Sequence, residues 1–312
     1  MSNLNLVSII IPFYNEEENL KKLTESLIKN TNNLKYKFEF IFVDDGSTDQ
    51  SLNVIKKLKK KNFKIISLVR NFGQTAAIMA GIDNSDGEIF ILIDADGQND
   101  PSDIHKLLSM ITDGYDVVSG WRFNRNDGVI RVFFSKVANK FLSFFLNLKL
   151  NDYGCTLKAY KRRVIENVKL YGEMHRLIPF YAKLEGAKIA EVKVNHFPRK
   201  FGKSKYGMNR IFKVLLDTIL LVFFRKFINK PIYFFGGIGI LFFLLSCFTF
   251  LYSLKLKYLD GISFILTPLP ILIIFFFITS IMSIFFGIIS EVLSRTYHES
   301  QKKKSYTIKF IE

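Results

Sequence analysis

The sequence predicts an α/β protein with an open, mostly parallel sheet, followed by an amphipathic helix and a hairpin of two membrane-spanning helices. Apolar runs alternate with helical patterns through the first 120 residues, and this alternation is typical of parallel sheets. Polar side chains follow four successive apolar runs. Two long stretches near the C-terminus carry no charge at all.

Five short apolar runs are predicted to be β-strands: residues 7–12, 38–43, 65–69, 89–93 and 117–119. The patterns between them predict helices at residues 16–29, 50–60, 74–82 and 101–112. Asp49 is expected to be the N-cap of the second helix, and Pro101 suits the first turn of the fourth.

The polar residues that follow the first four strands are expected to form one site, because ligands of such sheets bind beyond the carboxyl ends of the strands. In chain order they are Tyr14-Asn15-Glu16, Asp44-Asp45-Gly46-Ser47, Arg70-Asn71 and Asp94-Ala95-Asp96.

The Asp94-Ala95-Asp96 segment is expected to bind a divalent metal. Its two carboxylates are two residues apart and so lie on the same side of the strand end. Carboxylates together with diphosphate oxygens suit Mg²⁺ or Mn²⁺, and Gln98 offers a further oxygen. The alternative is that the segment merely caps the helix that begins near Pro101.

The first two strand ends are expected to hold a nucleotide. Gly46 makes a turn after the second strand, which leaves Asp44 or Asp45 to face the base or the ribose. Tyr14 offers a stacking surface and Glu16 an acceptor.

The charge-free stretches 232–252 and 262–290 are each long enough to cross a bilayer, which takes about 20 apolar residues. Arg225, Lys226 and Lys230 precede the first and Arg295 follows the second, together with Lys302 to Lys304, so both ends of the hairpin are expected on the cytosolic side. The apolar run near Met1 has no basic segment before it and is therefore read as a strand, not a signal peptide. These features predict a catalytic domain on the cytoplasmic side of the inner (plasma) membrane.

The chain is therefore expected to consist of four segments: a catalytic domain (1–205), an amphipathic juxtamembrane helix (206–230), the two spans (231–292) and a basic cytosolic tail (293–312). Residues 129–148 and 206–228 mix basic and aromatic side chains, which suits a helix at the headgroup interface. Packing on the sheet as core helices is the alternative for both.

The net charge of +16 favours anionic lipids and phosphorylated substrates as partners. No nucleic-acid-binding module is recognisable, so nucleic acid is not expected as a partner. Cys155 and Cys247 are expected to remain reduced in the cytosol.

Several motifs resemble the family 2 glycosyltransferases of GT-A fold: SIIIPFYNEEENL, FVDDGSTD, RNFGQTAAIMAG, DADGQNDP and SGWR. The similarity is greatest to their polyprenyl-phosphate branch, which includes dolichyl-phosphate mannose synthases and bacterial undecaprenyl-phosphate glycosyltransferases. It covers roughly residues 5 to 210 in order, and the two C-terminal spans match the bacterial members. The resemblance thus implies a Rossmann-like GT-A domain, and it is compatible with a homo-oligomer.

The resemblance, joined to the strand-end positions, implies four groups of site residues. The donor-binding residues are Pro12, Tyr14, Glu16, Asp44, Asp45, Arg70, Asp94 and Ala95, and the metal ligands are Asp94, Asp96 and Gln98. The residues for the acceptor phosphate are Arg122, Arg131, Arg199, Ser204 and Lys205, and the catalytic residues are Asp96, Arg122 and Asp152. The chain departs from its relatives at Cys155-Thr156 and at Lys158, which lie on the acceptor side.

The expected reaction transfers a sugar from a UDP- or GDP-linked donor to a polyprenyl phosphate, with inversion at the anomeric carbon. A phosphate monoester has a second pKa of about 6 and is already anionic at neutral pH, so a general base is not required. Asp152 is then a positioning or assisting residue, with an obligatory base as the alternative. His175 is read as structural, or as a residue that approaches the site from a later helix.

Two rival functions remain open: a transferase that acts on a hydroxyl of a lipid or polysaccharide, and a non-catalytic membrane module that binds a nucleotide sugar. The intact Asp94-Ala95-Asp96 disfavours the second. Glucose, mannose, N-acetylhexosamine and amino-arabinose donors all fit the motifs.

Overall fold

The computed structural model describes residues 6–123, 139, 143, 146, 148–165, 174–184, 186–198, 231–300 and 308–311. The chain divides into two compact units, Met1–Asp217 with Lys304–Glu312, and Thr218–Lys303. The predicted amphipathic stretches 129–148 and 206–228 lie almost entirely outside the described residues.

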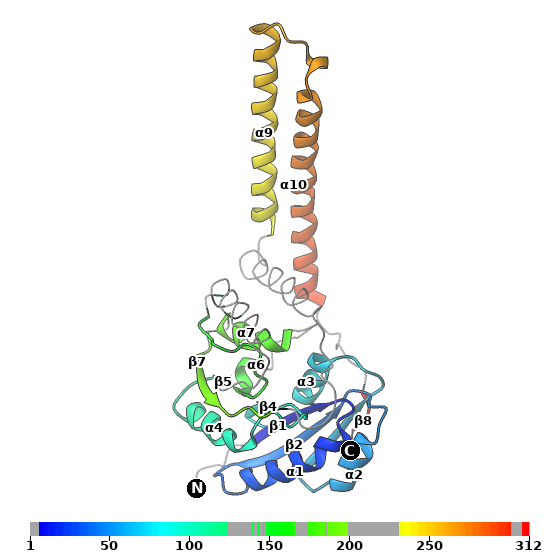
Figure 1. Cartoon of the computed structure of the whole chain (residues 1–312), viewed down its shortest axis with the longest axis vertical. Helices are drawn as coiled ribbons and strands as arrows, with labels where there is room; N and C mark the ends of the chain where they lie inside the picture. Colours follow the sequence, from blue (N-terminus) through cyan, green and yellow to red (C-terminus); the bar gives the residue numbers. More distant parts are fainter. Residues whose placement is uncertain are drawn as a thin grey trace. The chain divides into compact units, whose positions relative to one another are not determined.

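The first unit is built on an eight-stranded sheet (Figure 1). Its strands, in sheet order, are β7 (Ile189–Val194), β5 (Val117–Arg122), β6 (Lys158–Lys161), β4 (Ile89–Leu92), β1 (Leu6–Phe13), β2 (Lys37–Asp44), β3 (Phe63–Leu68) and β8 (Ile308–Ile311). β6 and β8 run antiparallel to their neighbours, and the other described strands are parallel. The predicted mostly parallel sheet is confirmed.

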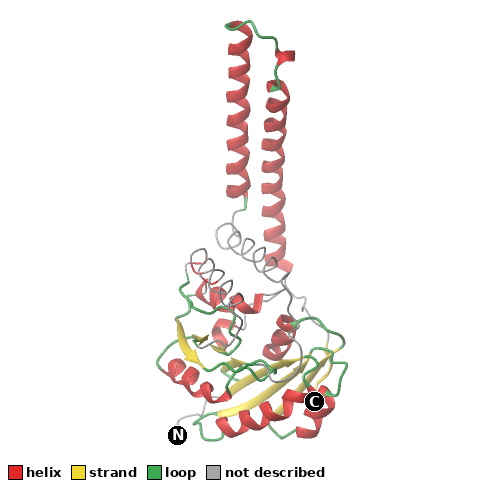
Figure 2. Cartoon of the chain, viewed as in Figure 1, coloured by secondary structure: helices red, strands yellow, loops and turns green. Residues whose placement is uncertain are grey.

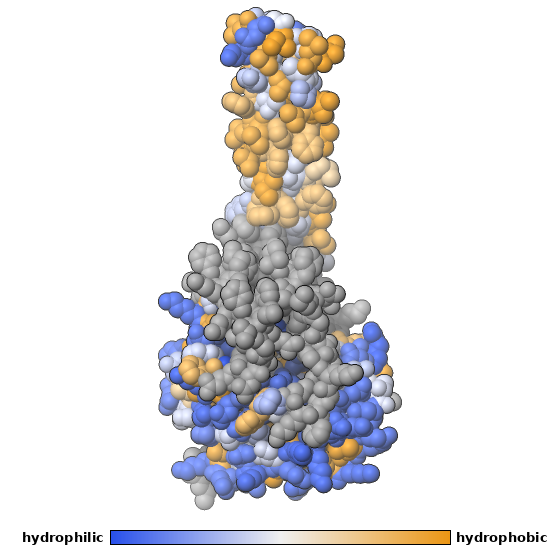
Figure 3. All heavy atoms as spheres, in the orientation of Figure 1, coloured by the Kyte–Doolittle hydropathy of each residue, from blue (hydrophilic) through white to orange (hydrophobic). Residues whose placement is uncertain are grey.

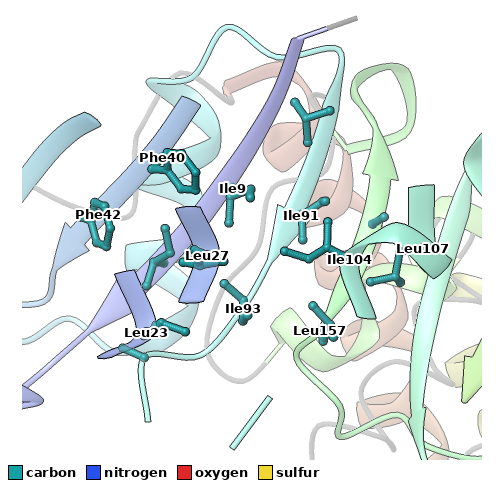
Figure 4. Packing of buried hydrophobic residues seen from close by; sticks show 14 of the residues in the cluster. Ile9, Leu23, Leu27, Phe40, Phe42, Ile91, Ile93, Ile104, Leu107 and Leu157 are labelled. Carbon is teal, nitrogen blue, oxygen red and sulfur yellow. The ribbon is translucent and has the colours of Figure 1, made fainter. Parts of the chain in front are cut away.

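The central strands are apolar throughout because both faces of the sheet are covered. In β2, Phe40 and Phe42 lie in one core cluster with residues of α1 (Glu17–Thr31) and α4 (Ile104–Thr112), as Figure 4 shows. The alternate residues Ile41 and Val43 lie in a second cluster with α3 (Gln74–Asp83). The side chains of a strand alternate between its faces, so each strand contributes to both cores.

The four predicted helices are present, with small shifts at their ends. The second is α2 (Ser51–Leu58), and Gln50, not Asp49, is its N-cap. Asp49 nevertheless accepts a hydrogen bond from the backbone N–H of Ser51 at 2.9 Å, so its carboxylate still serves the helix end.

The fourth predicted helix begins with a 3₁₀ turn, Pro101–Asp103, and continues as α4. Asp100 occupies the N-cap position and accepts from the backbone N–H of Ser102. The suggestion that Asp94 to Asp96 cap this helix is therefore wrong.

Further short helices complete the first unit: α6 (Arg162–Ile165), a 3₁₀ turn at Met174–Leu177 and α7 (Ile178–Leu184). They follow the antiparallel strand β6, and residues of α6 and α7 join the second core cluster.

The second unit is a hairpin of α9 (Ile232–Tyr258) and α10 (Leu269–Ser300), which lie side by side in Figure 2. A 3₁₀ turn, Phe264–Leu266, joins them. The second predicted span begins at residue 262, whereas α10 begins at Leu269. Prolines 268 and 270 explain the later start, because proline is tolerated in the first turn of a helix but not in its interior.

Small residues form the contact between the two helices of the hairpin. The buried residues are Gly239, Ser246 and Ser253 on α9 and Ser280, Ser283 and Gly287 on α10. A Cβ on Gly239 would lie 2.8 Å from Cγ1 of Ile284. The outer surface is Phe, Leu and Ile (Figure 3). Both helices are long and apolar enough to cross a membrane, and small residues at the contact are typical of membrane helices.

Candidate functional site

The loops after β1 and β2 are joined by a network of hydrogen bonds. Asn15, whose φ is +52°, accepts from the backbone N–H of Thr48 at 2.8 Å. The N–H of Asn15 donates to Ser47 Oγ at 3.0 Å, and the N–H of Glu16 donates to Ser51 Oγ at 2.8 Å. Tyr14 and Glu16, both predicted donor-binding residues, are therefore held on a rigid double loop.

Asp44 and Asp45 both have partners within the chain. Asp44 accepts from the N–H of Ser47 at 2.8 Å and from the hydroxyl of Ser67 at 3.1 Å. Asp45 accepts from the N–H groups of Phe72 and Gly73 at 2.8 and 2.9 Å. The two carboxylates therefore fix the loops after β2 and β3 relative to each other.

Burial raises the pKa of Asp45 to about 6, although the hydrogen bonds from Phe72 and Gly73 oppose the shift. A carboxylate with little access to water gains from any further donor that reaches it. Asp45 is thus suited to accept a hydrogen bond from a ligand.

Asp94 lies at the centre of the site, beyond the end of β4. Its Oδ1 accepts from Gln74 Nε2 and its Oδ2 from Thr156 Oγ1, both at 2.6 Å. Burial raises the pKa of Asp94, while the Thr156 hydrogen bond and the charges of Arg122 and Arg176 oppose the shift. Asp94 beyond β4, Gln74 at the start of α3 and Thr156 before β6 thus meet at one carboxylate.

The Asp94 and Asp96 carboxylates fit a divalent metal only as part of a shared site. Both residues are half-buried, and Asp96 Oδ1 accepts from the N–H of Gln98 at 3.1 Å. Within the part of the chain that the structure describes, no three His, Cys, Asp or Glu residues are grouped as a metal cage. Oxygen ligands of this kind suit Mg²⁺ or Mn²⁺ when substrate phosphates supply the remaining positions.

Arg122 and Asp152 form a bidentate ion pair, with Nε to Oδ2 at 2.6 Å and Nη2 to Oδ1 at 2.8 Å. Asp152 also accepts from the N–H groups of Arg122 and Gly154, and Glu191 accepts from the N–H of Asp152 at 3.0 Å. The Asp152 side chain is 3% exposed and that of Arg122 is 15% exposed. Asp152 therefore fixes the orientation of the Arg122 guanidinium.

The sequence did not point to Gln74 or Arg176 as residues of the site, and it marked Thr156 and Lys158 only as departures on the acceptor side. His175, for which a role at the site was one of two readings, is buried and shares a 2.7 Å hydrogen bond with Thr75 Oγ1 through Nδ1. Burial lowers the pKa of His175 well below its usual range, so the ring is neutral.

The remaining predicted residues fall in three classes. Pro12 and Ala95 are buried, the first within β1 and the second in the core. Arg70 is exposed, and its guanidinium lies 4.4 Å from the centre of the Phe72 ring. The acceptor-phosphate residues outside the described part of the chain are Arg131, Arg199, Ser204 and Lys205.

Comparisons with known proteins agree on one family. Residues 8–169 match the model of glycosyl transferase family 2. The chain is 36% identical to the dodecaprenyl-phosphate galacturonate synthase of Rhizobium johnstonii, over 98% of this chain and 92% of that protein. It is 32% identical to the undecaprenyl-phosphate 4-deoxy-4-formamido-L-arabinose transferase of Shewanella sediminis, over 99% and 93% of the two chains.

Among solved structures, glucosyl-3-phosphoglycerate synthase from Mycobacterium tuberculosis matches with a TM-score of 0.55 and 20% identity, over 69% of this chain and 80% of that one. The same enzyme in complex with Mn²⁺, UDP and phosphoglyceric acid matches with a TM-score of 0.53 and 19% identity, over 69% and 78% of the chains. At this identity the match shows the fold alone, and it confirms the predicted GT-A fold.

Proposed function

The chain belongs to glycosyl transferase family 2, and we propose that it transfers a sugar from a nucleotide-diphosphate donor to the phosphate of a polyprenyl lipid. Relatives that match nearly the whole chain are named for transfer to dodecaprenyl or undecaprenyl phosphate. The product is a polyprenyl-phosphate sugar, and the nucleoside diphosphate leaves.

The donor occupies the strand ends in this account. Tyr14, Glu16 and Asp45 hold the nucleotide, supported by the loop network around Asn15 and Gly46. Asp94, Asp96 and Gln98 hold Mg²⁺ or Mn²⁺, which neutralises the charge of the leaving diphosphate when bound. Distant neighbours of this fold were solved with Mn²⁺ or Mg²⁺ and UDP.

The acceptor phosphate binds at Arg122. A guanidinium held from one side by a carboxylate presents its other N–H groups in a fixed direction, which suits a phosphate. Arg131, Arg199, Ser204 and Lys205 are proposed to add further contacts. Because the acceptor is already anionic, the work of the protein is to position it and to stabilise charge.

Asp152 serves as a positioning residue in this mechanism, not as the base. Its oxygens accept four N–H groups, three of them from Arg122. A carboxylate that accepts this many hydrogen bonds is a weak base. The acceptor phosphate is already ionised, so the reaction does not need a base to deprotonate it.

The hairpin of α9 and α10 anchors the enzyme to the membrane that holds its lipid substrate. The basic residues on both flanks of the hairpin favour a cytoplasmic catalytic unit. This is the face on which nucleotide sugars are available.

The observation that carries the proposal is the meeting of Asp94, Asp96 and the Arg122–Asp152 pair at one end of the sheet, in a chain that also has two apolar helices. The test uses membranes that contain the full chain, a panel of labelled UDP- and GDP-sugars, and undecaprenyl phosphate. Label is expected in the lipid extract, and EDTA or Asp96→Ala is expected to abolish it. Binding of donors without transfer of any sugar would contradict the proposal.

A further inference from the structure

Two aromatic rings and one lysine form a cluster that has no role in the mechanism above. Trp121 is on β5, Phe123 directly follows that strand, and Lys193 is on the neighbouring edge strand β7 (Figure 1). The rings of Trp121 and Phe123 meet edge to face, with their centres 5.1 Å apart. Lys193 Nζ lies 4.1 Å from the centre of the Phe123 ring and 5.4 Å from that of Trp121. We call these three residues the aromatic–lysine cluster.

The aromatic–lysine cluster is open at the surface. Phe123 is 55% exposed, Lys193 is exposed and Trp121 is half-buried. One exposed apolar side chain is ordinary, but aromatic rings joined to a cation are typical of surfaces that meet a bilayer, where rings contact hydrocarbon and the cation contacts the headgroups. Among the residues that the structure describes, no carboxylate forms an ion pair with Lys193. Its charge is therefore available to the phosphate of a lipid headgroup.

The cluster lies on one defined face of the sheet. Trp121 and Lys193 are paired in the register of β5 and β7, so their side chains lie on the same face. Val117, four residues before Trp121, belongs to the second core cluster, together with residues of α3 and α7. In contrast, Ile55 of α2 belongs to the first core cluster. A bilayer that contacts the aromatic–lysine cluster therefore leaves α2 on the far face of the sheet.

The cluster also flanks the residue that is proposed to bind the acceptor phosphate. Arg122 lies between Trp121 and Phe123 in the chain, and consecutive Cα atoms are about 3.8 Å apart. A polyprenyl phosphate keeps its hydrocarbon chain in the bilayer, because each buried methylene group favours that state. When its phosphate is at Arg122, the bilayer surface must therefore approach the end of β5 closely. Phe123 is the apolar side chain that is exposed there.

Resting on the proposed function, we infer that the aromatic–lysine cluster is a docking surface for the lipid bilayer. Phe123 and Trp121 enter the boundary between headgroups and acyl chains, and Lys193 contacts the headgroup phosphates. The two apolar helices keep the chain in the membrane, whereas the cluster sets the level of Arg122 relative to the lipid phosphates. Docking at this surface thus serves the binding of the acceptor and leaves the binding of the nucleotide sugar unaffected.

Trp121 is the only tryptophan of the chain, so its fluorescence tests the docking without a label. The full chain is reconstituted in phosphatidylcholine–phosphatidylglycerol vesicles, with or without bromine atoms on the upper part of the acyl chains, and bromine quenches only nearby tryptophans. Trp121 is expected to lose most of its emission in the brominated vesicles. The matched control is Lys57→Trp in a Trp121→Phe background, since Lys57 is exposed on α2, and it is expected to lose little. No quenching of Trp121, or equal quenching at both positions, would overturn the inference.

Kinetics in the same vesicles separate docking from a structural role. Phe123→Ser is expected to raise KM for undecaprenyl phosphate at least ~10-fold, the effect of one aromatic side chain that no longer enters the apolar phase. Phe123→Leu is expected to stay close to the wild type. Neither variant is expected to change KM for a short, water-soluble isoprenyl phosphate or the dissociation constant of the nucleotide sugar.

An equal loss with both acceptors in Phe123→Ser would overturn the inference, because it would mark Phe123 as part of the phosphate site or of the fold. The failure of the inference can be told from that of the proposed function. Transfer to undecaprenyl phosphate by a chain whose Trp121 is not quenched would refute the docking surface alone. Quenching of Trp121 without transfer of any sugar would refute the proposed function and support the docking surface.

Discussion

At the scale of single residues, the arrangement of Arg122 and Asp152 separates two mechanisms. A catalytic base needs a lone pair that faces the acceptor, whereas a positioning carboxylate directs its lone pairs at the group that it orients. The four N–H groups on Asp152 match the second description. The two roles differ in what a variant does to the pH profile.

Asp152→Asn is therefore expected to lower kcat/KM for the lipid acceptor by about 10- to 100-fold, the range for one charged hydrogen bond. The pH dependence of kcat/KM is expected to keep its shape. In a double-mutant cycle with Arg122→Lys the two losses are expected not to add, because both variants break the same pair. Loss of the acidic limb of the profile in Asp152→Asn, with additive losses in the cycle, would identify Asp152 as a base.

The raised pKa of Asp45 predicts that donor binding depends on pH. Its pKa in the folded protein is raised to about 6, so its carboxylate is ionised above that pH and protonated below it. If the ionised form accepts a hydrogen bond from the nucleotide, donor affinity is expected to fall up to ~10-fold between pH 7.5 and pH 5. A nucleotide sugar suits the measurement, because its phosphates have no second ionisation in this range.

The control for Asp45 is Asp45→Asn, which is expected to bind the donor more weakly at pH 7.5 and to lose most of the pH dependence. Titration calorimetry at several pH values gives both quantities. An unchanged pH slope in Asp45→Asn would show that another group is responsible.

At the scale of elements, the loops after β2 and β3 approach so closely that only glycine fits between them. Gly46 has a φ of +73°, and a Cβ there would lie 2.5 Å from the backbone carbon of Arg70. Gly114 also has a positive φ, +98°, but a Cβ on it would have nothing within 4 Å. A side chain at position 114 would therefore meet backbone strain alone, whereas one at position 46 would meet the same strain and a steric clash with the backbone of Arg70 as well.

Gly114→Ala is expected to cost about 1 kcal/mol of unfolding free energy, the usual effect of a left-handed non-glycine residue. Gly46→Ala is expected to cost about 1 to 3 kcal/mol more, because backbone atoms must move, and to weaken donor binding as well. Thermal unfolding of the purified chain and donor titration give the two readouts. Equal effects of the two variants would mean that the loops adjust without cost.

The sequence predicts β1 to β5 well because their apolar runs reflect burial on both faces of the sheet. It does not predict β6, since that strand is only four residues long and carries lysine at both ends, one of them buried. β8 is missed because its partner β3 lies more than 200 residues away. Edge and antiparallel strands depend on such distant pairing, which leaves no periodic pattern.

The same distinction holds in the site. Asp94 and Asp96 stand out in the sequence because they end a strand. The contacts that complete the site join residues 62 and 100 positions apart, Asp94 with Thr156 and Thr75 with His175. No local spacing indicates these pairs, and only the fold brings them together.

At the scale of the whole molecule, the path of the chain fixes the topology of the hairpin. The chain leaves the first unit before α9 and returns after α10 to add β8 beside β3. If α9 and α10 cross a membrane, both ends of the hairpin must therefore lie on the same side. Charge distribution and strand pairing lead independently to this topology.

Cysteine labelling tests that topology. Asp260→Cys, in the segment between α9 and α10, and Lys57→Cys, on the first unit, are each placed in a Cys247→Ser background, Cys155 being buried. An impermeant maleimide is expected to label position 260 only in spheroplasts and position 57 only in inverted vesicles. Labelling of both positions from the same side would show that the helices do not cross the bilayer.

The central claim concerns the acceptor atom, and one comparison tests it most directly. The purified chain is given its preferred donor and either undecaprenyl phosphate or undecaprenol, two lipids that differ only in the phosphate. The lipid products are then identified by mass spectrometry. The account predicts a sugar-phosphate lipid from the first acceptor and no product from the second, because Arg122 has no phosphate to bind there. Comparable transfer to the free alcohol would contradict it and would assign the enzyme to transferases that act on hydroxyl groups.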